Sequence, residues 1–378
     1  MSLSRFRGSN RDKVDSWLLL SVLMLVGVGL IMISSASVVL SSEYFGSNYA
    51  YSSKQLLHFG IGLVALIVGV LVDYRLWQRL APALLGVIIL LLLATHIPGL
   101  AQTAQGAQRW IELGPIQFQP SELVKIFAIL YFAAWLAAKG SHLSSLTRGL
   151  VPFITVLGVI TLLIFAQPDA GTAMVILFTV TTMYFIAGAP WMHLFYAGIL
   201  GGSLFGLLIL SAPYRLQRFL VFLNPSEETL GAAYHINQAL LAIGAGGMFG
   251  VGFGQSKQKF LYLPEPHTDS IFAITIEELG FLRAMLIVAL LIFVMLRGYQ
   301  IARVVQDPFG RYVAVGITSL IAIQTFINIG AMLGLMPLTG VTLPFISYGG
   351  SSLISLLFGV GILLNISRQA VLIPKGMH

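Results

Sequence analysis

The chain has 378 residues, of which 57% are hydrophobic and only 9% are charged. Soluble proteins carry about 25% charged residues, so this composition excludes an ordinary soluble domain and predicts an integral membrane protein. The net charge of +7 fits cytoplasmic loops and anionic lipid, and no motif for binding nucleic acid is present. The absence of cysteine excludes disulfides and cysteine-ligated zinc.

Apolar segments of about 20 residues, the length that crosses a bilayer, recur along the chain. We expect an all-α fold with ten membrane-spanning helices, at residues 16–40, 54–73, 77–97, 120–138, 149–166, 170–187, 192–210, 271–296, 310–335 and 344–366. Together they form one polytopic domain, residues 1–378. Most lysines and arginines fall on the side that holds both termini, which places the tails, residues 1–15 and 367–378, in the cytoplasm. Residues 98–119 and the large loop 211–270, between helices 7 and 8, then face outward.

The 211–270 loop is too long to be a plain connection. It begins with PYRLQRFLVFLNP, in which Arg215 and Arg218 lie beside apolar residues, and this pattern predicts an amphipathic helix at the outer interface. Its middle, residues 232–254, predicts a helix that runs into a glycine-rich stretch. The glycines indicate tight, irregular backbone near the membrane, because no strand and no GxGxxG spacing supports a dinucleotide site.

Polar residues interrupt the apolar pattern at four places, and the first is the segment 106–125. Glu122 and Lys125 are three residues apart, so they share a helix face and can pair; they form either a structural ion pair or part of a polar cavity. Ser121 is a possible helix cap. Arg109 suits a phosphate, and Trp110 suits a membrane interface with or without a function.

The second and fourth places lie at span boundaries. Asp169, after Pro168, is either a helix cap or a carboxylate that faces the outer cavity. Residues 337–353 hold two prolines, a glycine pair, Tyr348 and several hydroxyls, including Ser347. Broken backbone at membrane depth is tolerated where it is buried in protein or lines a cavity, so this segment is either a kinked helix entry or part of a site.

The third place surrounds Asp269, which directly precedes an apolar run. Its polar neighbours in sequence are Lys257, Lys259, Glu265, His267, Thr268, Glu277 and Glu278. Asp269 is either a helix cap or a functional acid. Glu277 follows it by eight residues, which is two helical turns along roughly the same face. Apolar surroundings raise the pKa of a carboxylate toward neutrality, and this suits a general base.

Metal and nucleotide chemistry have little support. The seven histidines are scattered without paired spacing, and no P-loop is present. The sequence therefore assigns no cofactor. A divalent cation, Mg²⁺ or Mn²⁺, held by acidic side chains beside a pyrophosphate is the alternative that it leaves open.

Four motifs carry a family resemblance, in this order: GAQRWIELGPIQFQPSELVK, AQPDAGT, LPEPHTDSIFA with EELG, and PLTGVTLPFISYGGSS. They resemble the SEDS family over nearly the whole chain, and PYRLQRFLVFLNP and TLPFISYGGSS look most like its cell-division branch. The resemblance implies a ten-span peptidoglycan glycosyltransferase that polymerises lipid II in the bacterial inner membrane, at the division septum. It also implies a class B penicillin-binding protein, an FtsI-like transpeptidase, as partner, together with other membrane proteins of the divisome.

The resemblance makes Asp269, the aspartate of the HTD motif, the essential residue, and we expect it to act as general base. The substrate-binding candidates are Arg109, Trp110, Glu122, Lys125, Asp169, Arg215, Arg218, Lys259, His267, Thr268, Glu277 and Ser347. One departure is Arg283, where the family has small apolar residues; we expect it to pair with Glu277 or Glu278. The alternatives are a lipid II flippase, an elongation polymerase and a non-enzymatic scaffold.

Overall fold

The computed structural model describes residues 14–95, 97, 101–104, 107–113, 116–210, 216 and 231–370. The helices are α1 (Ser16–Ala36), α2 (Val38–Phe45), α3 (Ala50–Leu71), α4 (Tyr74–Ala94), α5 (Pro120–Lys139), α6 (Val151–Ala166), α7 (Ala170–Ile186), α8 (Trp191–Leu210), α10 (Ala232–Gly246), α11 (Ile271–Val304), α12 (Pro308–Met332) and α13 (Gly350–Ala370). A 3₁₀ turn, η1 (Gly140–Ser144), and a π turn, η2 (Leu146–Leu150), connect α5 to α6. The strands are β1 (Ala101–Ala104), β2 (Ala107–Leu113) and β3 (Ile116–Phe118).

The long apolar helices confirm the prediction of a helical membrane protein. Within the described residues, eight helices are long and apolar enough to cross a bilayer, namely α1, α3, α4, α5, α6 with η2, α11, α12 and α13. Helix α7 is a shorter apolar helix. Each of the ten expected spans overlaps one of the helices α1, α3 to α8 and α11 to α13, but the count of ten crossings stays a prediction.

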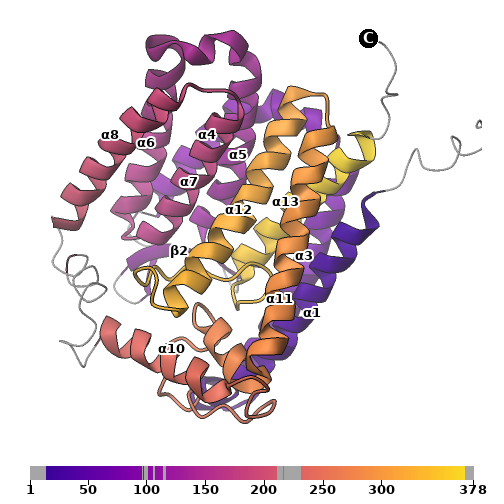
Figure 1. The fold of residues 1–378 in the computed structure, drawn as a ribbon, viewed down its shortest axis with the longest axis vertical. Coiled ribbons are helices and arrows are strands. Elements are labelled where there is room, and N and C mark those ends of the chain that lie inside the picture. Colours follow the sequence, from indigo (N-terminus) through magenta and orange to yellow (C-terminus); the bar gives the residue numbers. More distant parts are fainter. Residues whose placement is uncertain are drawn as a thin grey trace, which may run out of the picture.

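Helix α13 lies at the centre of the bundle (Figure 1) and is buried along almost its whole length. It packs along α3 and also touches α5 and α12. Glycines allow the close approach to α3: a Cβ on Gly69 would lie 2.8 Å from the carbonyl oxygen of Phe358. Small residues at such crossings let two helix backbones pack directly in a membrane protein.

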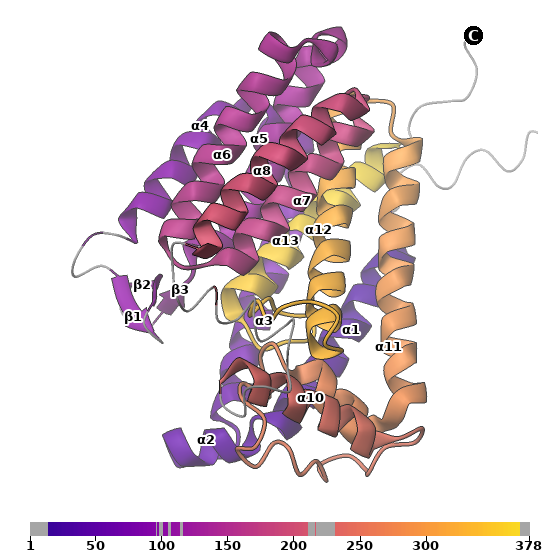
Figure 2. The same ribbon diagram turned by 60° about the vertical axis from the view of Figure 1, so that its left-hand side comes forward.

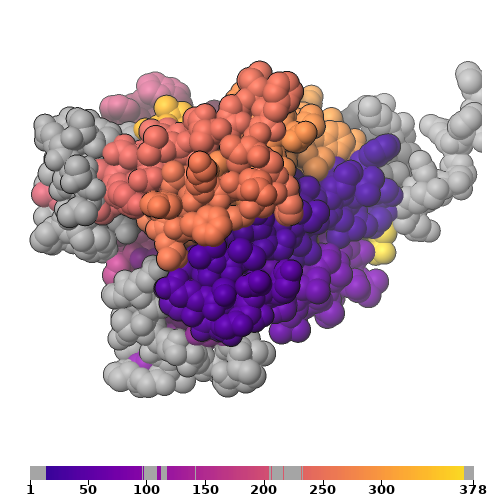
Figure 3. Space-filling view, turned by 90° about the horizontal axis from the view of Figure 1, so that it is seen from below, coloured from indigo at the N-terminus to yellow at the C-terminus, as the bar shows by residue number. Residues whose placement is uncertain are grey.

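The two ends of the bundle differ. Helix α10 lies across one end (Figure 1), and the chain between α10 and α11 covers that end beside the segment from α1 to α3 (Figure 3). At the opposite end, Arg297 of α11 pairs with Asp15 at 2.6 Å, and the backbone N–H of Asp15 donates to the hydroxyl of Ser367 at 3.2 Å. These contacts tie the start of α1 to α11 and to the end of α13.

Three local features differ from the expectations. The connection 98–119 contains an antiparallel sheet of order β1-β2-β3, which projects beside the bundle (Figure 2). The first expected span ends at Ala36, and residues 38–45 form a separate helix, α2. Residues 344–349 are not helical, so α13 begins only at Gly350. The expected amphipathic helix with Arg215 and Arg218 lies outside the described residues.

Candidate functional site

A break in α11 organises the α10 end of the molecule. Gly280 has φ 83° and ψ 167°, so the helix is interrupted between a short buried part, 271–279, and a long part, 281–304. At a break, the carbonyls before it and the N–H groups after it lose their helical partners. Glycine permits this backbone because it has no Cβ to clash at positive φ.

The glycine-rich segment after α10 replaces the lost helical bonds. The carbonyls of Glu277 and Glu278 accept from the N–H groups of residues 251 and 252, at 2.9 and 3.1 Å. In return, the N–H groups of residues 281 and 282 donate to the carbonyls of residues 247 and 248, at 2.9 and 3.2 Å. A Cβ on Gly246 or Gly250 would overlap the backbone of α11, which explains the glycines that the sequence indicated only as tight backbone.

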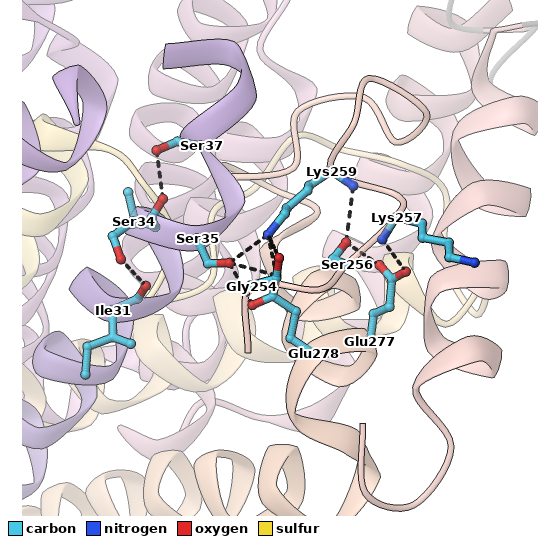
Figure 4. A network of polar contacts seen from close by, with 11 residues as sticks. Ile31, Ser34, Ser35, Ser37, Gly254, Ser256, Lys257, Lys259, Glu277 and Glu278 are labelled. Carbon is cyan, nitrogen blue, oxygen red and sulfur yellow. Dashed lines mark hydrogen bonds and ion pairs between the residues drawn. The ribbon is translucent and has the colours of Figure 1, made fainter. Parts of the chain in front are cut away.

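The two carboxylates before the break are held in a buried polar network (Figure 4). Glu278, fully buried, pairs with Lys259 at 3.0 Å and accepts from the hydroxyl of Ser35 in α1 at 2.7 Å. Glu277 accepts from the hydroxyl of Ser256 at 2.5 Å and from the N–H of Lys257 at 3.0 Å. The network therefore fixes α1 and the 254–259 segment against the break, as Figure 4 shows.

Arg283 does not take part in this network, so the expected pairing with Glu277 or Glu278 is wrong. The Arg283 side chain is exposed, and its guanidinium donates to the carbonyls of Phe249 and Leu279 at 3.2 and 3.4 Å. The break at Gly280 separates it from both glutamates, whose partners come from the preceding loop and, for Glu278, also from α1.

Asp269 lies two residues before the start of α11 at Ile271 and is partly exposed. The residue at the helix cap is Ser270, without a side-chain capping bond, so Asp269 is not the cap and does not share a helix face with Glu277. The hydroxyl of Thr268 lies 3.0 Å from the Glu265 carboxylate and 3.3 Å from that of Asp269, so its single proton serves one of the two acids at a time. The amide of Asn328 in α12, 1% exposed, donates to the backbone carbonyl of Asp269 at 2.8 Å.

The sequence reasoning did not single out Asn328. The same amide donates to the carbonyl of Val341 at 2.8 Å, so Asn328 joins the Asp269 loop to the 333–349 segment. An asparagine inside an apolar span is costly unless it is bonded, and this was the available signal. Ser270 holds the other side of the loop: its hydroxyl donates to the carbonyl of Pro264 at 2.9 Å and contacts the ring of His235 in α10 at 2.6 Å.

His267 is buried against two tyrosines whose rings also contact each other, with centroids 5.1 Å apart. Its ring centroid lies 4.4 Å from that of Tyr51 and 5.3 Å from that of Tyr348, and its carbonyl accepts from the N–H of Tyr348 at 2.8 Å. Burial lowers the pKa of His267, although Glu265 partly offsets this, and burial raises the pKa of Tyr348 to about 12. His267 is therefore neutral at pH 7, so it supplies no positive charge to a phosphate.

A second acidic group lies at the start of α5 and α7. Glu122 and Lys125 form the predicted pair at 2.7 Å, and both side chains are buried. Asp169 caps α7 by accepting from the N–H of Thr172 at 3.1 Å. Ser121 lies inside α5, so it is not the cap that the sequence suggested. Its hydroxyl donates to Asp169 at 3.4 Å instead.

Arg109 and Trp110 lie on β2, whose residue 110 pairs with residue 102 of β1. The Arg109 guanidinium donates to the carbonyls of Gln167, at 3.0 Å, and Pro168. It therefore fastens the sheet to the turn that precedes Asp169. Arg109 is partly buried in this arrangement, and its two bonds go to backbone oxygens.

The 333–349 segment lies between the two acidic groups. It reaches Asp269 through Asn328, and a Cβ on Gly171 of α7 would lie 2.5 Å from the carbonyl oxygen of Thr339. Ser347 is buried, and its hydroxyl accepts from the N–H of Leu343 at 2.8 Å, which stabilises a turn in this segment. The 333–349 segment thus contacts both the HTD loop and the start of α7, which Asp169 caps.

The described acidic residues do not gather as metal ligands. Among them and the described histidines, no group of three or more lies close enough to hold an ion. The buried Glu122 and Glu278 are each paired with a lysine, which satisfies their charge without a metal. Within the described part of the chain, these residues do not form a ready-made site for a divalent cation, and no chemical step is assigned to one.

Comparison with known proteins places the whole chain in one family. Residues 16–371 match the FtsW/RodA/SpoVE family of cell cycle proteins. Stage V sporulation protein E of Bacillus subtilis is 45% identical over 96% of this chain and 99% of its own length. A probable peptidoglycan glycosyltransferase FtsW of Geobacter sulfurreducens is 40% identical over 95% of this chain and 96% of its own length.

Two solved structures share the fold. A chain of a peptidoglycan synthase complex that coordinates polymerization and crosslinking has a TM-score of 0.78 at 28% identity, covering 94% of this chain and 98% of that one. The rod shape determining protein RodA of Thermus thermophilus has a TM-score of 0.66 at 29% identity, covering 94% and 97%. The chain therefore belongs to the FtsW/RodA/SpoVE family of cell cycle proteins, as its four motifs predicted.

Proposed function

We propose that this protein is a peptidoglycan glycosyltransferase that polymerises lipid II at the outer face of the bacterial inner membrane. The relatives named peptidoglycan glycosyltransferases support the reaction class. One structural observation supports Asp269 as the reacting acid. Glu122, Asp169, Glu277 and Glu278 are buried, whereas the Asp269 side chain is partly exposed and its backbone carbonyl is held by Asn328.

In the proposed reaction a sugar hydroxyl of one substrate attacks the anomeric carbon of another. The carbon–oxygen bond to the lipid pyrophosphate breaks, and the pyrophosphate leaves with the electron pair. Asp269 takes the proton from the attacking hydroxyl as general base. Direct displacement inverts the anomeric carbon from α to β, so no covalent sugar–enzyme intermediate is needed.

Cations must stabilise the charge that develops on the pyrophosphate. Lys125 and Lys259 are both paired with buried glutamates, and Arg109 is bonded to two backbone carbonyls. A role for any of them requires a rearrangement when substrate binds. Arg215 and Arg218 lie outside the described residues, and we keep them as the first candidates for this task.

Members of the family share a reaction class but are named for different cellular roles. We propose a septal role in cell division with a class B penicillin-binding protein, which would supply crosslinking. The likeness to a chain of a peptidoglycan synthase complex supports such a partner. The 45% identity to a sporulation protein supports a sporulation role as a second candidate. Depletion separates these roles: filaments indicate division, spheres indicate elongation, and a defect confined to spores indicates sporulation.

The test of Asp269 is lipid II polymerisation by the purified protein with its class B partner in detergent. We expect Asp269→Asn to abolish glycan formation while the variant still binds the partner. Asp307→Asn is the matched control, because Asp307 caps α12 at the other end of the long part of α11 and asparagine preserves a cap. Normal polymerisation by Asp269→Asn would exclude the proposed base.

The same assay separates the enzyme from a lipid transporter, which the buried ion pairs inside the bundle would also suit. Transport is not observable in detergent, so glycan formation there supports the enzyme. A transporter or a scaffold would form no glycan, with or without Asp269.

A further inference from the structure

The glycine-rich segment Met248–Phe253 and Arg283 are sequence features that the proposed reaction does not use. The position of helix α11 determines how deep both features lie in the membrane. From residue 281 to residue 304 it is uninterrupted and spans roughly 36 Å at 1.5 Å per residue. This part alone exceeds the hydrocarbon thickness of a bilayer, which is about 30 Å. Gly280 therefore lies near one boundary of the membrane.

The segment Met248–Phe253 lies at the same depth as that boundary. Backbone hydrogen bonds join residues 247 and 248 to residues 281 and 282, and join residues 251 and 252 to residues 277 and 278. Glycine contacts keep the two backbones too close for any side chain between them. The segment cannot rise into the aqueous phase without breaking all four bonds.

The side chains of this segment are apolar and point outward. Phe249 is 72% exposed, and Met248, Val251 and Phe253 are each about half exposed. The exposed surface continues onto Phe281, Leu282 and Leu286 of α11. A continuous apolar surface of this kind is unfavourable in water.

The hydrogen bonds of Arg283 support the same depth in the membrane for Met248–Phe253. Both of its hydrogen bonds go to carbonyls on the α10 side, those of Phe249 and Leu279, so the long side chain reaches toward the membrane boundary. Arginine near the end of a membrane helix snorkels in this direction to keep its charge out of the hydrocarbon. This accounts for a cation that has no acidic partner in α11.

We propose that Met248–Phe253 is inserted into the outer leaflet of the bilayer, with Phe249 among the acyl chains and Arg283 at the level of the lipid phosphates. The occupant of this surface is lipid because the surface is continuous with the face of the membrane helix α11. Such an insertion fixes the depth in the membrane of the chain that leads from this segment to the HTD loop. The Lys259–Glu278 pair holds that chain against α11. The assignment does not depend on the role of Asp269.

The absence of cysteine makes the test direct, because a single introduced cysteine is the only labelling site. The full chain carrying Phe249→Cys is labelled with a nitroxide and reconstituted in vesicles of phosphatidylethanolamine and phosphatidylglycerol. Two collision rates of the nitroxide are measured and compared. One is its collision rate with oxygen, which concentrates among acyl chains, and the other is its collision rate with a water-soluble nickel chelate. Leu286→Cys, on the lipid-facing side of α11, and Lys257→Cys, an exposed charged position in the same loop, are the references.

We expect Phe249→Cys to behave like Leu286→Cys, with several-fold more oxygen collision relative to nickel than Lys257→Cys. Val251→Cys repeats the measurement if Phe249→Cys does not fold. Nickel access equal to that at Lys257→Cys would overturn the proposal. Protection from both reagents once a class B partner is added would assign the surface to that protein and would also overturn it.

Discussion

Replacing Asn328 tests how the Asp269 loop is held. Its buried amide donates to the carbonyls of Asp269 and Val341, both at 2.8 Å. Asn328→Ala removes both bonds and leaves two carbonyls with one partner fewer. An unsatisfied buried polar group costs about 1–3 kcal/mol, so we expect a loss of roughly 2–4 kcal/mol in the free energy of unfolding. A displacement of the loop by about 1 Å would lower kcat by up to about 100-fold.

The assay is lipid II polymerisation per folded molecule, with kcat and KM measured separately. We expect kcat to fall at least tenfold with little change in KM. Asn365→Ala is the matched control, because Asn365 is also a buried helical asparagine, fully shielded, that donates to the carbonyl of Val70 at 2.7 Å. Asn365 lies far along α13 and also accepts from the N–H of Tyr74 at 3.2 Å, so Asn365→Ala should lose at least as much stability with unchanged kcat.

Two results would refute this reasoning. One is a kcat for Asn328→Ala within twofold of the parent protein, which would mean that the carbonyl bond does not position Asp269. The other is an equal fall of kcat in Asn365→Ala, which would mean that the loss reflects general loosening of the bundle.

Three further predictions concern the α10 end. Lys259→Met should cost about 3–5 kcal/mol because it leaves the buried charge of Glu278 without its cation, and the double variant with Glu278→Leu should recover most of this loss. Equilibrium unfolding in SDS measures both variants, and simple additivity would contradict a coupled pair. Gly250→Ala should destabilise much more than Gly254→Ala, because both have positive φ but only Gly250 contacts the α11 backbone; equal melting temperatures would contradict this. The depressed pKa of His267 means that the unfolded chain binds a proton that the folded chain does not, so stability should fall as pH drops below about 6.5. His267→Phe should flatten that pH profile, and an unchanged slope would assign it to another group.

The sequence predicted what depends on short spacing. Apolar length located the helices and the three-residue spacing predicted the Glu122–Lys125 pair, while the turn position of Asp169 indicated its cap as one of two interpretations. Each of these features involves residues within one helix or one turn. Their partners are set by local geometry, which a single sequence displays directly.

The remaining contacts at the site join segments that are far apart in the chain. Glu278 meets Ser35 across 243 residues, and Asn328 meets Asp269 across 59. Spacing carries no information about such pairs, so Glu278 and Arg283 looked like partners because they are close in sequence. The sequence did not predict the break at Gly280 for the same reason. The hydrogen bonds that replace the helical ones at this break come from the segment after α10.

The buried Lys259–Glu278 pair has a role that stability alone does not explain. Apolar residues of similar volume often stabilise a protein as well as a buried ion pair does. This pair, however, joins α1, the loop and the break in α11, so it specifies how the loop leaves the break. At the far end of that loop, Asn328 and Tyr348 hold the backbone of residues 267–269 from α12 and the 333–349 segment. The 333–349 segment therefore contacts the HTD loop directly, through the N–H of Tyr348 and the carbonyl of His267, and is joined to Asp269 through Asn328, independently of α11.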